Sequence, residues 1–314
     1  MRAWNKADEF LKINTKKFFF ITGEKEKTMK NSVQDLIKTR TSCRSYLETP
    51  IQTDKREIMD EFLNANLKGP FNSNTRFKLV SASDNDNEEL KNLGTYGFIK
   101  GASGFIIGAV DKGSEKNMED YGYLMEKIIL LATDLELGTC WLGGTFNKST
   151  FAQKISMEEN EIVPAVTAIG NKMPKRTTLD SVVRWVAGSH NRQAWDKLFF
   201  INNFDTPLIQ TGADYEMPLE MVRLGPSASN RQPWRIIKEQ EHHIFHFYLQ
   251  RTKNYNRNIR LLKLADLQRI DMGIAMCHFE LSMQSINFSG QWKDVDPKLP
   301  VLPESTEYII SWVS

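Results

Sequence analysis

The sequence predicts an α+β fold in which two tandem, degenerate copies of one helix-flanked antiparallel-sheet unit pair as an intramolecular pseudo-dimer. Three observations lead to this class. Two long segments, near residues 124–135 and 267–281, place apolar residues at the spacing of a buried helix face. An apolar strand pattern follows each of them, at 163–169 and 308–313. The predicted elements of the second half also follow the order of those in the first half, but there are fewer of them.

The composition agrees with a globular protein of this size. The 314 residues are 40% hydrophobic and 25% charged, which is enough chain for a large core or two fused units. The net charge is only +2 and the lysines are spread along the chain, so the sequence shows no cluster of positive charge that would indicate nucleic-acid binding. The cysteines Cys43, Cys140 and Cys277 lie far apart without metal-ligand spacing, which fits a reducing compartment and no metal site. His242 and His246 share a face of a predicted strand and are interpreted as surface residues.

The chain ends and hydrophobic runs suggest a cytoplasmic protein without a membrane partner. No apolar run approaches the ~20 residues that a membrane-spanning helix needs. The basic start has an apolar stretch, 18–21, that is shorter than the core of about 7 or more residues in a secretion signal. We interpret residues 1–28 as an N-terminal extension that need not belong to the fold, residues 29–178 as the first half and residues 179–314 as the second half.

The first half begins with a helix that Ser32 caps, since Val33, Leu36 and Ile37 follow at helical spacing. The further elements are expected in the order helix 55–66, strand 77–82, helix 88–93, strand 104–110, the first long helix, short helix 149–155 and strand 163–169. Gly138 is the expected C-cap of the long helix.

A phosphate-binding candidate follows the first helix. Arg40, Ser42 and Arg44 stand at alternating positions, so in an extended or turning chain their side chains project to one side. Two guanidinium groups and a hydroxyl would then converge on a phosphate. The alternative is a solvated basic helix end whose arginines complement the C-terminal dipole.

A glycine-rich stretch follows the long helix. We interpret residues 139–144 as a loop that contains Trp141, Leu142, Gly143 and Gly144. Two adjacent glycines would let backbone amides approach a ligand closely.

The second half has one stretch of unusual composition. Its predicted elements are helix 215–224, strands 235–238 and 242–248, the second long helix and strand 308–313. Between the helix and the first strand lies Gly-Pro-Ser-Ala-Ser-Asn-Arg-Gln-Pro-Trp, residues 225–234, whose small polar side chains are hard to explain as core. Gly225 and Pro226 end the helix. The stretch is either a buried turn that presents polar groups or an ordinary helix-to-strand loop.

These motifs resemble the nitroreductase family of FMN-dependent oxidoreductases. The phosphate-binding Arg-x-Ser-x-Arg of that family matches Arg40, Ser42 and Arg44. Its turn Pro-Ser-x-x-Asn-x-Gln-Pro-Trp, the most specific part of the resemblance, matches the stretch 225–234. The long helix and Gly-rich loop match residues 124–144, and a basic residue after the last strand matches Lys175 or Arg176. The resemblance covers roughly residues 30–314 and implies a nitroreductase-like fold.

The motifs are divided between the halves, whereas family members carry all of them in one chain and dimerise around two FMN sites. The first half has residues 69–77 where its own Pro-Ser-Asn turn should stand. The second half lacks Arg-x-Ser-x-Arg in its leading helix near 192–200 and the Gly-Gly loop at 287–292. The chain is therefore similar to a single-chain, pseudo-dimeric subgroup of the family, which implies a monomer with one FMN between its halves.

The resemblance implies an enzyme in which FMN passes electrons from NAD(P)H to a small acceptor such as a nitroaromatic or a quinone. No catalytic side chain is expected, because the cofactor carries the chemistry. The expected FMN-binding residues are Arg40, Ser42, Arg44, Trp141, Leu142, Gly143, Gly144, Lys175, Arg176, Pro226, Ser227, Ser229, Asn230 and Gln232.

Two other functions remain open on the sequence alone. The protein could bind, store or consume flavin without reductase turnover, because fold does not fix function. It could also be an interaction scaffold whose two sites have both decayed. Arg231 would either stabilise reduced flavin or point outward into solvent. The acceptor and the choice between NADH and NADPH depend on loops such as 254–263, which carry no readable motif.

Overall fold

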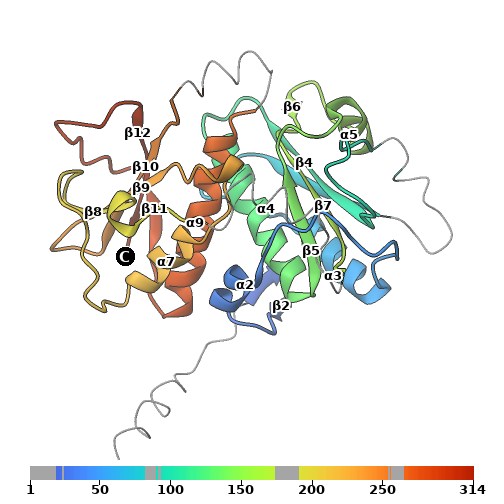
Figure 1. Ribbon diagram of the computed structural model, residues 1–314, viewed down its shortest axis with the longest axis horizontal. Helices are drawn as coiled ribbons and strands as arrows, with labels where there is room; N and C mark the ends of the chain where they lie inside the picture. The colour runs from blue at the N-terminus through green and yellow to red at the C-terminus, as the bar shows by residue number, and fades with distance from the viewer. Residues whose placement is uncertain are drawn as a thin grey trace, which may run out of the picture.

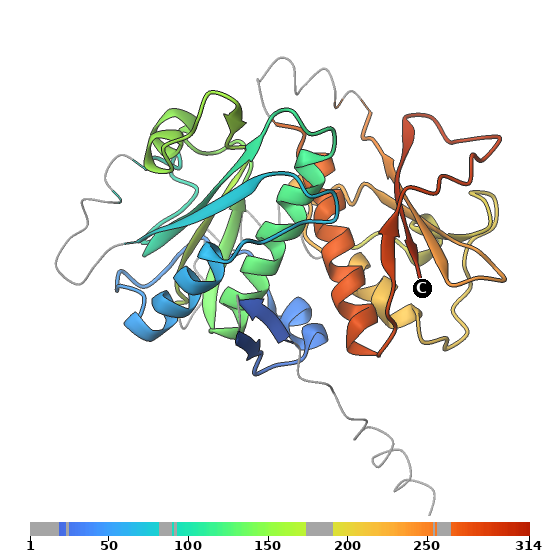
Figure 2. The ribbon, with the colours of Figure 1, turned by 180° about the vertical axis from the view of Figure 1, so that it is seen from behind.

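The computed structural model describes residues 19–22, 25–81, 90, 93–173, 191–253, 255 and 265–314. Two five-stranded sheets lie at opposite ends of the molecule, and two long helices stand side by side between them (Figures 1 and 2). These helices are α4, Asn117–Asp134, and α9, Leu267–Ser285. The predicted α+β class, with two copies of one unit facing each other, is confirmed.

The first sheet has the order β3, β4, β7, β5, with β6 paired to β4, and all its pairs are antiparallel. Its strands are β3 (Thr75–Ser81), β4 (Gly104–Asp111), β5 (Leu137–Leu142), β6 (Glu161–Ile162) and β7 (Val166–Asn171). Strand β4 is buried on both faces: Ile106 belongs to the core around α4, and Ile107 packs with Phe151 on the other side. This burial explains its continuous apolar run, which has no alternation.

The second sheet has the order β11, β12, β10, β9, β8. Its strands are β8 (Phe199–Ile201), β9 (Trp234–Lys238), β10 (Ile244–Gln250), β11 (Gln291–Lys293) and β12 (Thr306–Val313). Strands β8 and β9 are parallel, so this sheet is mixed, whereas an antiparallel sheet was expected. The reason is the crossover between them, which contains helix α7, Glu216–Arg223.

Helices α4 and α9 approach each other closely because each carries a glycine at the contact. A Cβ on Gly122 would collide with the Ile270 carbonyl, and one on Gly273 would collide with the Glu119 carbonyl. The two contacts exchange the roles of the helices, as a pseudo-twofold axis requires. Both helices are almost wholly buried, so the interface between the halves is the centre of the core.

The shorter helices agree with the sequence prediction within a few residues. They are α2 (Val33–Thr39), α3 (Thr53–Asn64), α5 (Lys148–Lys154) and α7. Ser32 caps α2 as predicted, because its side chain accepts a hydrogen bond from the Asp35 amide. The predicted helix 88–93 lies largely outside the described residues.

Three assignments were wrong: the cap at Gly138, the loop at 139–144 and the helix at 192–200. Gly138 does not cap α4, which ends at Leu135, and the segment 137–142 is strand β5 instead of a loop. The chain turns at Glu136, whose φ of 63° is left-handed, and then pairs with β7 through residues that favour strands. The segment 192–200 is not a helix but a 3₁₀ turn, η2 (Trp195–Lys197), followed by β8.

The N-terminal extension contains a hairpin of β1 (Phe19–Thr22) and β2 (Lys25–Thr28). Residues 1–18 lie outside the described part of the chain. Among the helices that the structure describes, none has the length and hydrophobicity required to cross a bilayer.

Candidate functional site

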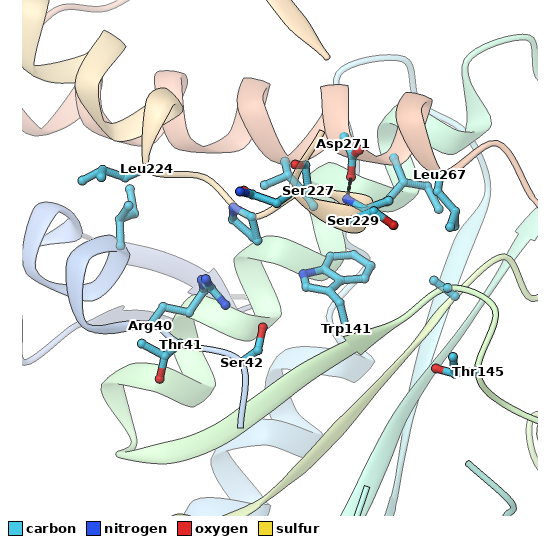
Figure 3. Close-up of a pocket in the computed structure, with 18 of the residues that line it drawn as sticks. Arg40, Thr41, Ser42, Trp141, Thr145, Leu224, Ser227, Ser229, Leu267 and Asp271 are labelled. Atoms are coloured by element: carbon cyan, nitrogen blue, oxygen red, sulfur yellow. Dashed lines mark hydrogen bonds between the residues drawn. The ribbon is translucent and has the colours of Figure 1, made fainter. Parts of the chain in front are cut away.

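A cavity of about 580 Å³ lies between the two halves beside the first turns of α9 (Figure 3). The first half contributes Arg40, Ser42, Arg44, Trp141, Gly143 and Gly144. The second half contributes Arg192, Pro226, Ser227, Ser229, Asn230 and Asp271. Its volume lies within the range of small-molecule and cofactor sites. The structure thus brings together the two sets of motif residues that lie far apart in the sequence.

The end of α2 places the arginine motif in the cavity. Arg40 follows the last helical residue, and the chain then runs beside β5, where Cys43 N donates to Thr139 O at 2.8 Å. This extended course turns the alternate residues Arg40, Ser42 and Arg44 toward the cavity. The Arg40 side chain is 8% exposed, so it is not a solvated helix end.

The buried carboxylate of Glu126 positions side chains that the first half contributes to the cavity. Glu126 of α4 is fully buried, and its Oε2 accepts a hydrogen bond from Trp141 Nε1 at 2.9 Å. Its Oε1 lies 3.0 Å from His278 Nε2 and 3.8 Å from Arg40 Nε. Burial alone would raise the pKa of Glu126, but the hydrogen bond and charge of His278, with smaller contributions from Arg40 and Trp141, hold it below its usual value. The ionised Glu126 therefore orients two cavity side chains from behind.

His278 links this carboxylate to the second half. Its Nδ1 lies 2.9 Å from the Met221 carbonyl, which can only accept, and its Nε2 faces the ionised Glu126. Both ring nitrogens therefore act as donors, and the pair has the geometry of a buried imidazolium–carboxylate contact. It ties α9 and α7 to α4 directly behind the cavity.

The stretch 225–234 is a defined turn with several residues in left-handed conformations, and not an ordinary loop. It contains the 3₁₀ segment η3, Ala228–Asn230, and Ser229, Asn230 and Gln232 have φ values of 50°, 54° and 50°. Such left-handed conformations are rare outside glycine and persist only where the surroundings fix them. Asn230 Oδ1 accepts a hydrogen bond from Arg192 Nη1 at 2.9 Å, which supplies part of that support.

Two predicted residues do not line the cavity. Leu142 points to the opposite side of β5 from Trp141 and packs in the core with Phe151, because successive strand residues alternate. Gln232 is 2% exposed, and its Oε1 accepts from Gln193 N at 2.8 Å while its Nε2 donates to Asn230 O at 3.1 Å. Its amide therefore stabilises the turn from inside.

Three further residues fall elsewhere. Lys175 and Arg176 lie outside the described residues. Arg231 is exposed and faces a separate pocket with Gln193 and Arg235, so it points away from the main cavity. The outward alternative for Arg231 is the one observed.

Sequence reasoning missed two cavity residues. Arg192 precedes the turn in the connector and has no motif around it. Asp271 lies on α9, where its Oδ1 accepts from Ala228 N at 2.9 Å and so fixes the turn to the helix (Figure 3). A signal for Asp271 did exist: the long helices share Asp-x-Gly, at Asp120 and at Asp271.

In the part of the chain that the structure describes, no group of three acidic, histidine or cysteine side chains could hold a metal ion. His242 Nδ1 and His246 Nε2 each lie 3.0 Å from a Glu239 oxygen. His246 is 2% exposed, so its interpretation as a surface residue was wrong. It is buried because β10 is covered on that face, and burial lowers its pKa.

Comparisons with known proteins agree with this architecture. A family profile described as "Putative TM nitroreductase" matches residues 32–283. A crystal structure of a protein described as a putative nitroreductase from Thermotoga maritima is 17% identical and has a TM-score of 0.54, covering 94% of this chain and 99% of that chain.

Smaller nitroreductases align with about half of the chain. A nitroreductase family protein from Clostridium difficile is 19% identical over 49% of this chain and 92% of its own, with a TM-score of 0.37. A nitroreductase from Bacteroides fragilis, described as having FMN bound, is 22% identical over 47% of this chain and 94% of its own, with a TM-score of 0.35. A search of curated proteins gives no significant match. Because the family profile spans most of the sequence, the chain belongs to the nitroreductase family, in its TM1586-like branch.

Proposed function

We propose that the chain is an FMN-dependent oxidoreductase with one FMN between its two halves. The observation that carries this proposal is the composition of the cavity. The phosphate-binding motif around Arg40 and Arg44 and the turn around Asn230 come from different halves, and both line the same space. Each half alone would present only part of a flavin site.

The residues present fit FMN in size and chemistry. A cavity of about 580 Å³ is large enough for a flavin nucleotide. Arg40 Nε is buried, and among the described residues no acceptor lies within hydrogen-bond distance of it, so a bound phosphate would supply one. A Cβ at Gly143 would collide with the Leu267 side chain, so glycine leaves room for both that side chain and the cavity.

The chain's own residues have separate tasks in this proposal. Arg40, Ser42 and Arg44 bind the phosphate through charge-assisted hydrogen bonds, and Arg176 or Lys175 adds a further positive charge. Trp141, fixed by Glu126, forms an apolar wall for the ring system. Ser227, Ser229 and Asn230 face the cavity from the turn. When bound, FMN supplies the hydride and electron chemistry, so no acid–base pair is needed.

The electron donor is NADH or NADPH, and the acceptor is a small molecule such as a nitroaromatic or a quinone. Both bind in the same cavity in alternation, since the second half lacks the motifs for another site. The chain acts as a monomer, because the interface that relatives form between subunits lies between its own halves. A reducing, cytoplasmic location is supported by its three separate cysteines, none of which is in a disulfide.

The test is a spectrum of the purified protein followed by anaerobic titration with NADH and NADPH. The proposal predicts a yellow protein that at least one nicotinamide nucleotide bleaches, and that a nitroaromatic or quinone reoxidises. A yellow protein that neither nucleotide reduces would instead indicate flavin binding without turnover. A colourless protein that FMN cannot reconstitute would exclude both functions.

A further inference from the structure

Each of the two central helices carries one buried aspartate at an equivalent position. Asp120 of α4 stands two residues before Gly122, and Asp271 of α9 stands two residues before Gly273. These glycines form the two pseudo-symmetric contacts between the helices. Asp120 and Asp271 are 0% and 3% exposed, so neither carboxyl is solvated.

The two carboxyls differ in the number of hydrogen bonds that they accept from the adjacent turn. In the first half, Asp120 Oδ1 accepts from Phe71 N at 2.9 Å and its Oδ2 accepts from Ser73 N at 2.7 Å. In the second half, Asp271 Oδ1 accepts from Ala228 N at 2.9 Å. Asp271 Oδ2 is equally buried but has no hydrogen-bond partner among the residues that the structure describes. The half with the intact turn motif therefore leaves one oxygen unused, and that carboxyl lines the cavity (Figure 3).

The burial of this carboxyl favours its protonated form. Burial, above all, raises the pKa of Asp271 well above its usual value; the hydrogen bond from Ala228 offsets part of this rise, and the charge of Asp266 adds to it. Because Oδ1 already accepts from Ala228, the proton resides on Oδ2. A buried donor without an acceptor is costly, so a molecule in the cavity that supplied one would gain affinity.

We propose that Asp271 is a binding residue that donates a hydrogen bond from Oδ2 to an uncharged acceptor, a ring nitrogen or a carbonyl oxygen, of the molecule in the cavity. The proposal rests on the proposed function, in which that molecule is FMN. It assigns Asp271 to the neutral ring system of FMN and not to the phosphate. Across the cavity, Arg40 and Arg44 supply the positive charge that a phosphate needs, which a carboxylic acid does not.

The same comparison fits a single FMN site between the halves. In the first half, the turn directs two amides at Asp120 and so occupies both oxygens. That carboxyl has become a structural anchor for the turn. In the second half, a single amide holds Asp271, and the other oxygen remains for a ligand.

The test is a titration of flavin-free protein with FMN, followed by quenching of flavin fluorescence. Asp271→Asn keeps an acceptor for Ala228 N and a donor toward the cavity, so its affinity should stay within about threefold of wild type. Asp271→Leu has neither group and should bind FMN about 10- to 100-fold more weakly. Asp120→Asn, at the equivalent place in the half without a site, should leave FMN affinity unchanged.

A pH series separates hydrogen-bond donation from a merely structural role. Raising the pH through the raised pKa of Asp271 should ionise this residue and weaken FMN binding by wild type, whereas Asp271→Asn should lack this component. The groups that face Asp271 are Asp266, Tyr255 and the cavity cations Lys38, Arg40, Arg44 and Arg192. Burial raises the pKa of Tyr255, and Asp271→Asn keeps all of these groups, so the difference between wild type and Asp271→Asn isolates the contribution of Asp271.

Three results would overturn the inference: wild-type affinity in Asp271→Leu, a loss in Asp271→Asn as large as in Asp271→Leu, or parallel pH profiles for wild type and Asp271→Asn. The last comparison decides the matter even if the leucine variant does not fold. Failure of the wild-type protein to bind FMN at any pH would contradict the proposed function instead.

Discussion

At the scale of single residues, two buried carboxyl groups beside the cavity, Glu126 and Asp271, have different partners. Glu126 is ionised and has three partners, so it serves as a fixed point from which Trp141 and Arg40 are oriented. Asp271 has no cationic partner among the described residues, and burial raises its pKa, which favours its neutral form. Glu126 thus positions the side chains of the site, whereas Asp271 offers a hydrogen-bond donor within it.

Loss of Arg44 should weaken the cofactor site directly. Arg44→Ala removes a charged donor from the phosphate-binding motif and should reduce FMN affinity by about 1.5 to 3 kcal/mol. Isothermal titration of flavin-free protein measures this change. Arg231→Ala is the matched control, because Arg231 faces outward and its loss should leave affinity unchanged. Equal effects of the two substitutions would argue against the assignment of Arg44.

Neutralising Glu126 should destabilise the whole fold. Glu126→Gln leaves His278 without its buried counter-charge and should lower the free energy of unfolding by about 3 to 5 kcal/mol. Chemical denaturation measures this loss. Glu57→Gln, which removes an exposed carboxylate on α3, should change stability by no more than about 0.5 kcal/mol. A loss of less than about 1 kcal/mol in Glu126→Gln would mean that the contact with His278 is not a buried ion pair.

Asp271 should make stability depend on pH in a defined direction. Its pKa is raised in the folded state, so between the unfolded and folded pKa values the folded chain binds more protons, and stability falls as pH rises. Asp271→Asn removes this slope, and its stability relative to wild type should therefore increase as the pH rises above the unfolded-state value of about 4. Denaturation of flavin-free protein across this range tests the sign. A relative stability that decreases with pH would show that the folded protein prefers ionised Asp271.

At the scale of elements, the long helices and the apolar strands were predictable because burial imposes a period on their sequences. Helix α4 and strand β4 have uninterrupted patterns, and their predicted positions agree with the structure. Strand β5 was missed because Gly138 and the Gly143–Gly144 pair suggested a loop. The strands β8 and β11 have only three residues each, which is too short for a periodic signal.

The site was predictable only where a motif carries it. The arginine motif and the turn could be found from their spacing, although Gln232 in the turn and Leu142 in the glycine-rich stretch face the core. Arg192 reaches the cavity through tertiary packing, which no local pattern encodes, whereas the Asp-x-Gly shared by the two long helices was a signal for Asp271. The sequence motifs therefore identified the two walls of the cavity, but not these two residues, which hold the turn through Asn230 and Ala228.

The close contact of α4 and α9 should not tolerate a methyl group. Gly273→Ala places a Cβ against the Glu119 backbone, which cannot move aside as a flexible side chain could, and should destabilise the protein by at least about 1 to 3 kcal/mol. Gly94→Ala is the control, since nothing lies within 4 Å of the position that its new Cβ would take. The melting temperatures of both variants measure the difference. A neutral effect of Gly273→Ala would contradict the packing described here.

At the scale of the whole molecule, the chain contains both sides of the interface between its two similar halves. Helices α4 and α9 form its centre (Figure 1). Their glycine contacts preserve the pseudo-twofold relation. The motifs are divided between the halves: the arginine motif lies in the first half and the turn lies in the second, and both line one shared cavity. We therefore expect a monomer whose folding and cofactor binding depend on both halves together.

The most direct test of this account is the number of FMN molecules that bind to one chain of 36.2 kDa. Titration of flavin-free protein, with the oligomeric state determined by light scattering, should give one FMN per monomeric chain. Arg44→Ala in the first half and Asn230→Ala in the second half should each weaken that same single site. Two equivalent sites per chain, or one site that is insensitive to changes in one of the halves, would contradict the account.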